Sequence, residues 1–202
     1  MMATLSHRVL SEAVLPGEGA LVWVKRAALV VAGIAALAIA AKVKVPIGPV
    51  PLTLGTFAVL SIGAAYGPRL GLATIMGYMV IGAIGFDVFA SSSAEKFGLT
   101  YMVGSTGGYL VGYVLATIAL GYFARLGWDR NVLKMSLAML IGNALIYIPG
   151  IVWLAHLYLE AQGWAVVLEW GLWPFLYGDA IKLALAALLF PAIWKLVGSA
   201  RT

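Results

Sequence analysis

At 202 residues, with 63% hydrophobic and 10% charged residues, the chain is far more apolar than a soluble domain, whose charged share is about a quarter. The net charge of +5 does not indicate a nucleic-acid partner, because the basic residues flank apolar runs, where they orient a protein in a bilayer. The absence of cysteine excludes disulfides and thiolate sites, and the only histidines, His7 and His156, are far apart. We therefore expect an integral membrane protein with no metal site.

The N-terminal residues 1–21 are polar to mixed and contain Pro16 and Gly17. They are expected to form a cytoplasmic tail or a segment lying on the membrane. The apolar run that follows Lys25 and Arg26 also fits a signal peptide cleaved near Ala40, but its basic pair comes late for one. It fits a first membrane crossing equally well.

The apolar runs approach the roughly 20 residues that a helix needs to cross a bilayer, and they lack the short alternating segments of a membrane barrel. The sequence predicts an all-α membrane protein with a domain over residues 22–197 and a C-terminal tail over 198–202. Six transmembrane helices are expected, at about residues 22–41, 52–66, 70–90, 105–124, 135–158 and 174–197.

The basic residues at the helix ends predict the orientation of the protein. Most of them fall on the side that holds the N-terminus: Arg8, Lys25, Arg26, Arg69, Arg125, Arg130, Lys134, Lys195 and Arg201. Only Lys42, Lys44 and Lys96 fall on the opposite side. By the positive-inside rule both termini are predicted to be cytoplasmic, with outer loops at 42–51, 91–104 and 159–173.

The last apolar run carries an aspartate and a lysine, Asp179 and Lys182, one helical turn apart near its outer end. One interpretation is a structural pair whose side chains reach outward to the interface. The other is a functional pair, since ionisable residues within membrane helices usually face a bundle interior or an aqueous cavity. The functional interpretation predicts an outward-open polar pocket for a small solute.

Two further segments have a structural and a functional interpretation. Asn143, Tyr147 and Trp153 share one face of the fifth helix and either line the pocket or hold helices together. GSTGGYL, residues 104–110, opens the fourth helix and either offers free backbone N–H groups to a ligand or provides glycines for close packing.

The first predicted helix carries alanines at a spacing of four residues, which forms a flat strip on one face. A neighbouring helix can approach such a strip closely, although alanine is common in any membrane crossing. We expect this strip to be the docking face for a partner subunit: Ala28, Ala32, Ala36 and Ala40.

Several segments carry a resemblance to a known family: VPIGPVPLTLGTFAVL (45–60), GPR (67–69), GAIGFDVFA (82–90), STGGYL (105–110), IYIPGIVWL (146–154) and PFLYGDAIK (174–182). They are similar to the BioY family of biotin transporters, the substrate-capture (S) components of energy-coupling factor (ECF) transporters. The resemblance covers about residues 27–195. Gly55, Ser105 and Asp87 stand where the family often has Gln, Pro and Pro, and Gly55 weakens the expectation of a ligand contact at that position.

The resemblance implies the ECF S-component fold and a high-affinity biotin pocket near the outer face, closed by the loop between the first two helices. Asp179 and Asn143 are expected to pair with the ureido group, and aromatic residues to pack on the bicyclic ring. Lys182, Lys42 and Lys44 compete for the carboxylate. The implied binding residues are Asp179, Lys182, Asn143, Tyr147, Trp153, Thr106, Tyr109, Thr53 and Lys44.

The resemblance also implies partners, namely a transmembrane coupling subunit and two cytoplasmic ATPase subunits, in the cytoplasmic membrane of a bacterium or archaeon. The absence of a G-x-x-x-x-G-K-[ST] motif agrees with ATP hydrolysis elsewhere. Biotin is then the transported ligand, and no cofactor is expected. A homo-oligomer and transport without the full complex stay open.

Three rival interpretations remain. The first is an S component for another vitamin, such as riboflavin or thiamine. The second is an intramembrane enzyme, which would need a nucleophile and a base, but the chain has neither H-E-x-x-H nor G-x-S-x-G. The third is a structural assembly subunit, which would need no polar pocket. We expect a transport protein and not an enzyme.

Overall fold

The fold is that of a computed structural model, which describes residues 8–14, 21–45, 50–92 and 96–199. Four helical stretches in this part of the chain are long and apolar enough to cross a membrane, so the predicted all-helical membrane fold is confirmed. The elements are α1 (Leu10–Val14), α2 (Leu21–Lys42), β1 (Lys44–Val45), β2 (Leu52–Thr53), α3 (Gly55–Ala83), α4 (Gly98–Met102), α5 (Gly107–Arg125), the 3-10 helix η2 (Trp128–Arg130), α6 (Val132–Gly171) and α7 (Trp173–Ser199).

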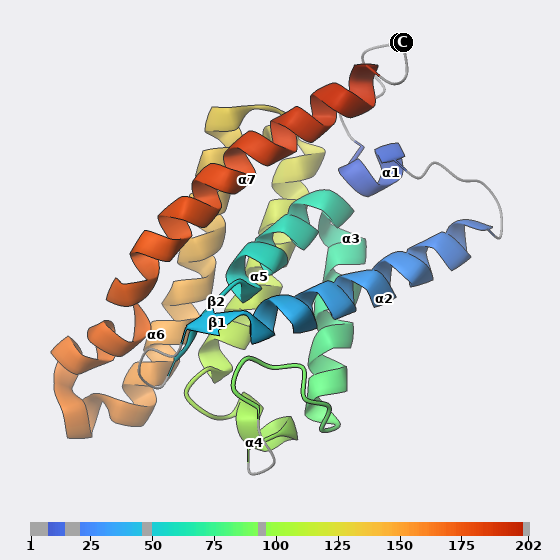
Figure 1. The fold of residues 1–202 in the computed structure, drawn as a ribbon. Coiled ribbons are helices and arrows are strands. Elements are labelled where there is room, and N and C mark those ends of the chain that lie inside the picture. The colour runs from blue at the N-terminus through green and yellow to red at the C-terminus, as the bar shows by residue number, and fades with distance from the viewer. Residues whose placement is uncertain (1–7, 15–20, 46–49, 93–95, 200–202) are drawn as a thin grey trace.

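The long helix α3 contains two crossings. Gly67 interrupts it with a φ of 78° and a ψ of 177°, which are not helical values. The chain then turns back. A Cβ atom on Gly71 would lie 3.5 Å from the Cα atom of Gly63, whereas the two residues would be about 12 Å apart along a straight helix. The two halves of α3 form a hairpin (Figure 1). Counted separately, they complete the six predicted helices with α2, α5, α6 and α7.

The second half of α3 is shorter than predicted. It ends at Ala83 and not near residue 90. Gly85 has a φ of 107°, a conformation that other residues rarely adopt, and the chain continues without helix through the described part of the loop up to Ser92. The residues of GAIGFDVFA after Ala83 therefore belong to a loop and not to a membrane helix.

The chain also reverses at a glycine near the C-terminal end of α6. Gly163 has a φ of 75° and a ψ of 167°, and residues 164–171 form a short return helix. This return helix packs on the preceding part of α6, since the rings of Tyr158 and Trp170 lie edge to face at 5.7 Å. The chain thus reverses within the segment 159–173 that was predicted as a loop, but most of this segment is helical, because one glycine is enough to reverse the chain between two helical segments.

The predicted loop at 42–51 contains the first strand of a small hairpin. β1 pairs with β2 in antiparallel register, with Lys44 opposite Thr53. This hairpin leads from α2 into α3 at the end of the bundle opposite α1, which we call the pocket end (Figure 1).

The central helix of the bundle is α5, which packs against α3 and α6. A Cβ atom on Gly121 would lie 2.3 Å from the backbone nitrogen of Pro68, and one on Gly112 would lie 2.6 Å from the Cα atom of Ile146. The absence of side chains at these glycines lets the backbones come into contact, as is common between membrane helices.

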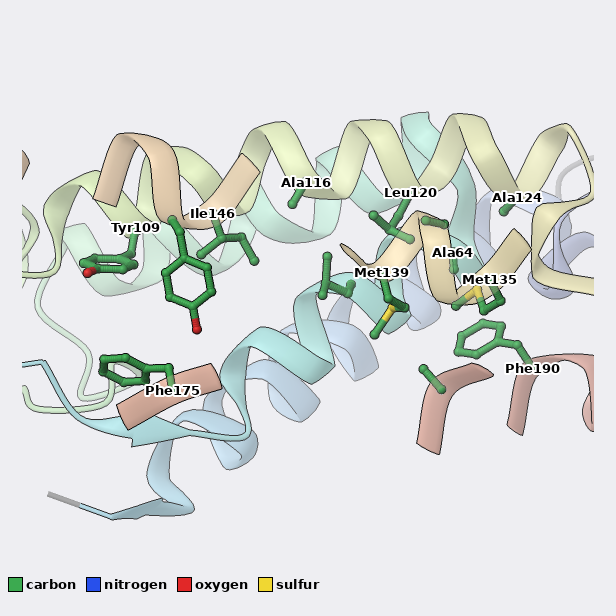
Figure 2. Close-up of a cluster of buried hydrophobic side chains, with 14 of the residues drawn as sticks. Ala64, Tyr109, Ala116, Leu120, Ala124, Met135, Met139, Ile146, Phe175 and Phe190 are labelled. Carbon is green, nitrogen blue, oxygen red and sulfur yellow. The ribbon is translucent and has the colours of Figure 1, made fainter. Parts of the chain in front are cut away.

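A continuous apolar core runs along α5, from the pocket end to the end that holds α1. Figure 2 shows Tyr109 and Phe175 at one end of this cluster and Ala124, Met135 and Phe190 at the other. The helix α2 lies outside this core and packs mainly on α3. Its Ala28, Ala32 and Ala36 are exposed and Ala40 is half-buried, so the strip is accessible, and its role as a docking face stays a prediction.

The described part of the N-terminal segment packs on the bundle. Val9 and Ala13 are fully buried, and the carboxylate of Glu12 accepts a hydrogen bond of 2.8 Å from the guanidinium of Arg125 at the end of α5. The helix α1 lies near the C-terminal part of α7, so the described ends of the chain share one end of the bundle, which we call the α1 end (Figure 1). That this end faces the cytoplasm stays a prediction.

A buried aspartate joins η2 to α7 at the α1 end. Asp129 is 1% exposed, and its Oδ2 accepts a hydrogen bond of 2.6 Å from the indole of Trp194. The guanidinium of Arg130 lies 4.1 Å from the centre of the same indole ring. Burial raises the pKa of Asp129 to about 6, although the Trp194 bond and Arg130 act in the opposite direction.

We predict that the free energy of unfolding falls as pH rises between 3.8, the ordinary pKa of an aspartate, and about 6, the pKa of Asp129 in the folded chain. The folded chain holds the proton up to about pH 6, whereas the unfolded chain releases it near the ordinary pKa of 3.8. The folded state therefore binds more protons in this window, and the free energy of unfolding falls as pH rises through it. Asp129→Asn should flatten this dependence and raise the free energy of unfolding at pH 7 by on the order of 2 kcal/mol.

Unfolding in detergent at pH 5 and pH 8 measures this difference. Asp87→Asn at the pocket end is the control, because the pKa of Asp87 is lowered and its titration lies below the window. An equal pH dependence in the Asp129→Asn variant and the parent would contradict the assignment.

Candidate binding site

The charged pair predicted on the last helix is buried. The Nζ atom of Lys182 lies 2.9 Å from Oδ1 of Asp179, one turn earlier on α7, and the two side chains are 11% and 7% exposed. Because both side chains are buried, the structure does not agree with the alternative of a pair that reaches outward. The pair instead faces the interior of the bundle.

Two other helices supply hydrogen bonds to this pair. Tyr147 on α6 donates its hydroxyl to Oδ2 of Asp179, and Lys182 donates to the hydroxyl of Thr56 on α3 at 2.9 Å. A buried ion pair is stable only when its remaining donors and acceptors are satisfied, and these contacts satisfy most of them. The network thus joins α3, α6 and α7 around one carboxylate.

A cavity of about 60 Å³ lies beside this network at the pocket end, and we call it the pocket. Its walls are mainly aromatic and threonine side chains, and Lys182 is the one charged residue of its lining among the residues that the structure describes. The lining comprises Leu37, Ala41, Val50, Pro51, Thr53, Gly55, Thr56, Tyr78, Phe89, Ala90, Tyr101, Thr106, Tyr109, Leu110, Tyr113, Tyr147, Phe175 and Lys182.

The structure brings five of the predicted residues together in this lining: Thr53, Thr106, Tyr109, Tyr147 and Lys182. Asp179 lies outside the lining, one hydrogen bond behind Lys182 and Tyr147. It therefore positions the two groups that reach the cavity.

The remaining predicted residues do not line the pocket. Trp153 donates its indole N–H to the carbonyl of Gly104 at 2.8 Å, and Lys44 donates to the carbonyl of Ala90 at 2.6 Å. The side chain of Asn143 is half-buried, and its Oδ1 atom has no hydrogen-bond partner among the residues that the structure describes.

Several lining residues were missed by the sequence analysis. Tyr113 follows Tyr109 by four residues and lies on the same face of α5, so helical spacing carried a signal for it. Thr56 carried no such signal, because Thr53 lies in β2 and Thr56 at the start of α3. Tyr78 and Phe89 carried no such signal, because they come from the end of α3 and from the loop after it.

The structure gives a physical reason for glycine at position 55. A Cβ atom there would lie 3.1 Å from the hydroxyl of Tyr113 and 2.9 Å from the hydroxyl of Thr53. The space that a larger side chain would occupy is therefore taken by the Tyr113 hydroxyl. Position 55 contributes only backbone to the pocket wall.

The glycines of the STGGY segment serve close packing. A Cβ atom on Gly108 would lie 2.2 Å from the carbonyl oxygen of Pro149, and one on Gly150 would lie 2.5 Å from the ring of Tyr109. The Tyr109 hydroxyl donates to the carbonyl of Gly171 at 2.8 Å and so ties α5 to the return helix of α6. These contacts fix Thr106 and Tyr109 at the pocket.

Lys42 at the end of α2 and Lys44 at the start of β1 hold the loop of residues 84–92 over the pocket, and we call these contacts the clasp. Lys42 donates to Oδ1 of Asp87 at 2.5 Å and to the carbonyl of Phe89 at 2.8 Å, and Lys44 binds Ala90 as described above. Hydrogen bonds from Lys42 and Ser92 lower the pKa of Asp87. Since Phe89 and Ala90 line the pocket, the clasp fixes part of its roof.

The buried pair predicts a non-additive effect on stability. Lys182→Met removes the cation and leaves the Asp179 carboxylate uncompensated, which should cost about 3–5 kcal/mol of the free energy of unfolding. Adding Asp179→Asn removes the uncompensated charge but keeps an acceptor for Tyr147, so the double variant should recover most of the loss. Unfolding of the purified protein in detergent without ligand measures both.

The control for this cycle is Lys195→Met, which removes an exposed lysine on the same helix and should change stability little. Equal stability of the Lys182→Met variant and the double variant would show that the two charges do not interact.

Comparison with known proteins gives the family. The family model described as "BioY family" matches residues 8–199. The chain is 36% identical to a "Probable biotin transporter BioY" of Pyrococcus horikoshii, over 82% of this chain and 93% of that one. It is 34% identical to a "Biotin transporter BioY" of Thermotoga maritima, over 83% of this chain and 96% of that one.

The fold also matches a solved structure. That structure is the S-component for biotin from an ECF-type ABC transporter, with a TM-score of 0.75 and 21% sequence identity over 89% of this chain and 95% of that one. At this identity the match speaks for the fold, and it agrees with the six helices described above. The extent of the family match, together with these relatives, shows that the chain belongs to the BioY family.

Proposed function

We propose that this protein binds biotin with high affinity and serves as the S component for its uptake. The observation that carries the proposal is the pocket, in which Lys182, held by Asp179 and Thr56, faces a wall of tyrosines. The relatives that are named biotin transporters support the choice of solute. The proposed protein is a transport component and not an enzyme.

The pocket chemistry suits the three parts of biotin. The aromatic rings of Tyr109, Tyr113 and Phe175 offer an apolar wall for the bicyclic ring. The hydroxyls of Thr53 and Thr106 can donate to, or accept from, the ureido group, whose polar atoms need partners when they are buried.

Lys182 is the proposed partner of the biotin carboxylate. Its ammonium group has three N–H donors, of which Asp179 and Thr56 accept two. Lys42 and Lys44, the other candidates, bind the roof loop through the clasp. The third donor of Lys182 is therefore the best placed cation for an acid group in the pocket.

The other predicted residues take supporting roles in this proposal. Asp179 orients Lys182 and Tyr147, and Trp153 holds the turn at Gly104 beside the pocket. The unpartnered Oδ1 of Asn143, one turn from Tyr147 on α6, is the proposed acceptor for a ureido N–H once the pocket widens.

Binding requires the pocket to widen. A cavity of about 60 Å³ is well below the roughly 300 Å³ or more of a typical ligand pocket. The roof formed by Phe89 and Ala90 belongs to the loop of residues 84–92 and not to a helix, although Phe89 itself is 1% exposed and packs on Tyr78 and Tyr101. This loop is the wall that we propose to move, and the movement would separate Phe89 from those two rings.

The proposal extends to partners and location. The chain has no P-loop, so the energy for uptake would come from two ATPase subunits through a transmembrane coupling subunit. The exposed strip of Ala28, Ala32 and Ala36 is the proposed contact with that coupling subunit. The proposed location is the cytoplasmic membrane.

Purified protein in detergent should show saturable binding of biotin by calorimetry, and neither riboflavin nor thiamine should compete. Lys182→Gln should weaken binding of biotin by about tenfold or more, since a hydrogen bond between charged groups contributes about 1.5–3 kcal/mol. The same substitution should change the affinity for biotin amide much less, because that ligand has no carboxylate.

The control is Lys195→Gln, which lies far from the pocket and should leave the affinity unchanged. An equal loss of affinity for biotin and biotin amide in the Lys182→Gln variant would assign Lys182 to the ureido ring instead. Absence of saturable biotin binding to the parent protein would overturn the proposed function.

Single cysteines test the proposed orientation, because the chain has none of its own. Glu160→Cys, near the outer end of α6, should react with a membrane-impermeant maleimide in intact cells. Lys195→Cys, at the α1 end, should react only after the membrane is permeabilised. The reverse pattern would place both termini outside.

A further inference from the structure

A second concave site lies at the α1 end, far from the pocket. It is a groove of about 1090 Å³ between α1, the first turns of α2 and the hairpin turn of α3. We call it the basic groove, because five cations line it: Arg8, Lys25, Arg26, Arg69 and Arg125. Glu12 is the one acidic residue of the described lining, so the balance is five positive charges against one negative, or +4.

The charge of the groove specifies an anionic ligand. Glu12, the one acid of the described lining, already accepts hydrogen bonds from Arg125. Arg26 and Arg69 are exposed and project from two different helices, α2 and α3. Cations gathered on a concave surface raise the local concentration of anions and favour a phosphate group.

The walls of the groove are apolar, and this favours a lipid over a soluble anion as the ligand. Val22, Leu29 and Val30 of α2 face Leu70 and Ala73 of α3 across it. Inorganic phosphate would contact the cations but leave these walls uncovered. An acyl chain would cover them, because its apolar surface matches theirs.

An aromatic side chain indicates the depth of the groove in the bilayer. Trp23 lines it, is 71% exposed, and lies 5.3 Å from the guanidinium of Arg26. Tryptophan side chains concentrate at the level of lipid headgroups, and arginine beside them extends toward phosphate. The cations of the groove therefore lie at headgroup level, with the apolar walls extending into the hydrocarbon.

We propose that the basic groove binds one anionic phospholipid, with its phosphate held by Arg26 and Arg69 and its upper acyl chain along α2 and α3. Such a lipid would link α1, α2 and the turn of α3. Since α2 packs mainly on α3, the lipid would add a second set of contacts to the least supported helix of the bundle. This proposal does not rest on the bound solute or on the orientation of the protein.

Native mass spectrometry of the detergent-purified full chain tests this proposal. The probes are phosphatidylglycerol and phosphatidylcholine with identical acyl chains, together with inorganic phosphate as the soluble anion. The parent should retain one phosphatidylglycerol at concentrations at which phosphatidylcholine is lost. The double variant Arg26→Gln/Arg69→Gln should bind it about thirtyfold more weakly, since each basic residue near a membrane surface contributes about 1 kcal/mol.

The matched control is Lys134→Gln/Lys195→Gln, which removes two exposed cations of the α1 end that lie outside the groove. It should keep the affinity of the parent within about twofold. Unchanged biotin binding and unfolding temperature without lipid would show that both double variants are folded.

Three results would overturn the proposal. Equal retention of the two lipids would show that the charge of the groove does not contribute to lipid selectivity. An equal loss of affinity for phosphatidylglycerol in both double variants would show that the lipid is attracted by the net charge of the protein alone. Displacement of phosphatidylglycerol by millimolar inorganic phosphate would assign the groove to a soluble anion.

Discussion

The close contact of α5 with its neighbours is the constraint on which the pocket depends. In a bilayer, backbone groups must bond within helices, so a membrane protein gains cohesion from packing and not from loops. Gly112 and Gly121 let the α5 backbone touch α6 and the turn of α3, and Gly108 does the same beside the pocket. Side chains at these positions would separate the helices that carry Thr56, Tyr109 and Tyr147.

The buried ion pair depends on this packing. Asp179 and Lys182 lie on α7, but the groups that satisfy them, Thr56 and Tyr147, lie on α3 and α6. A separation of these helices by one side chain would leave two charges in a weakly polar interior, at a cost of several kcal/mol. The chemistry of the site and the stability of the bundle are therefore set by the same contacts.

Much of the helical framework could be predicted from the sequence, because apolar runs and their flanking charges report directly on membrane crossings. The reversal at Gly67 falls in the predicted break between residues 66 and 70, but the return helix after Gly163 was not predicted. There a single glycine with a positive φ reverses the chain between two helical segments. The apolar GAIGFDVFA segment was predicted to be helix up to about residue 90, but α3 ends at Ala83, and Gly85 two residues later has a positive φ.

The site was predictable where motif and helical spacing coincided, as for Tyr147 and Lys182. It was not predictable where the contacts of a residue depend on how separate parts of the chain pack together. Trp153 shares a face with Tyr147, yet it binds the Gly104 carbonyl, and whether it faces the cavity depends on how α6 packs on α5. The roof residue Phe89 is held in the pocket wall by residues far from it in sequence, since Lys42, 47 positions earlier, binds its carbonyl and Tyr78 and Tyr101 pack on its ring.

The clasp has a mechanical consequence. Helix α2 is 22 residues long and contains no proline, and its one glycine, Gly33, keeps helical geometry, so the helix is continuous along the bundle. Lys42 at one end of this helix and Lys44 of the adjoining β1 hold the roof of the pocket, and Ala28, Ala32 and Ala36 are exposed along its length. A coupling subunit docked on that strip, as proposed above, would therefore contact the same helix that holds the roof over the solute.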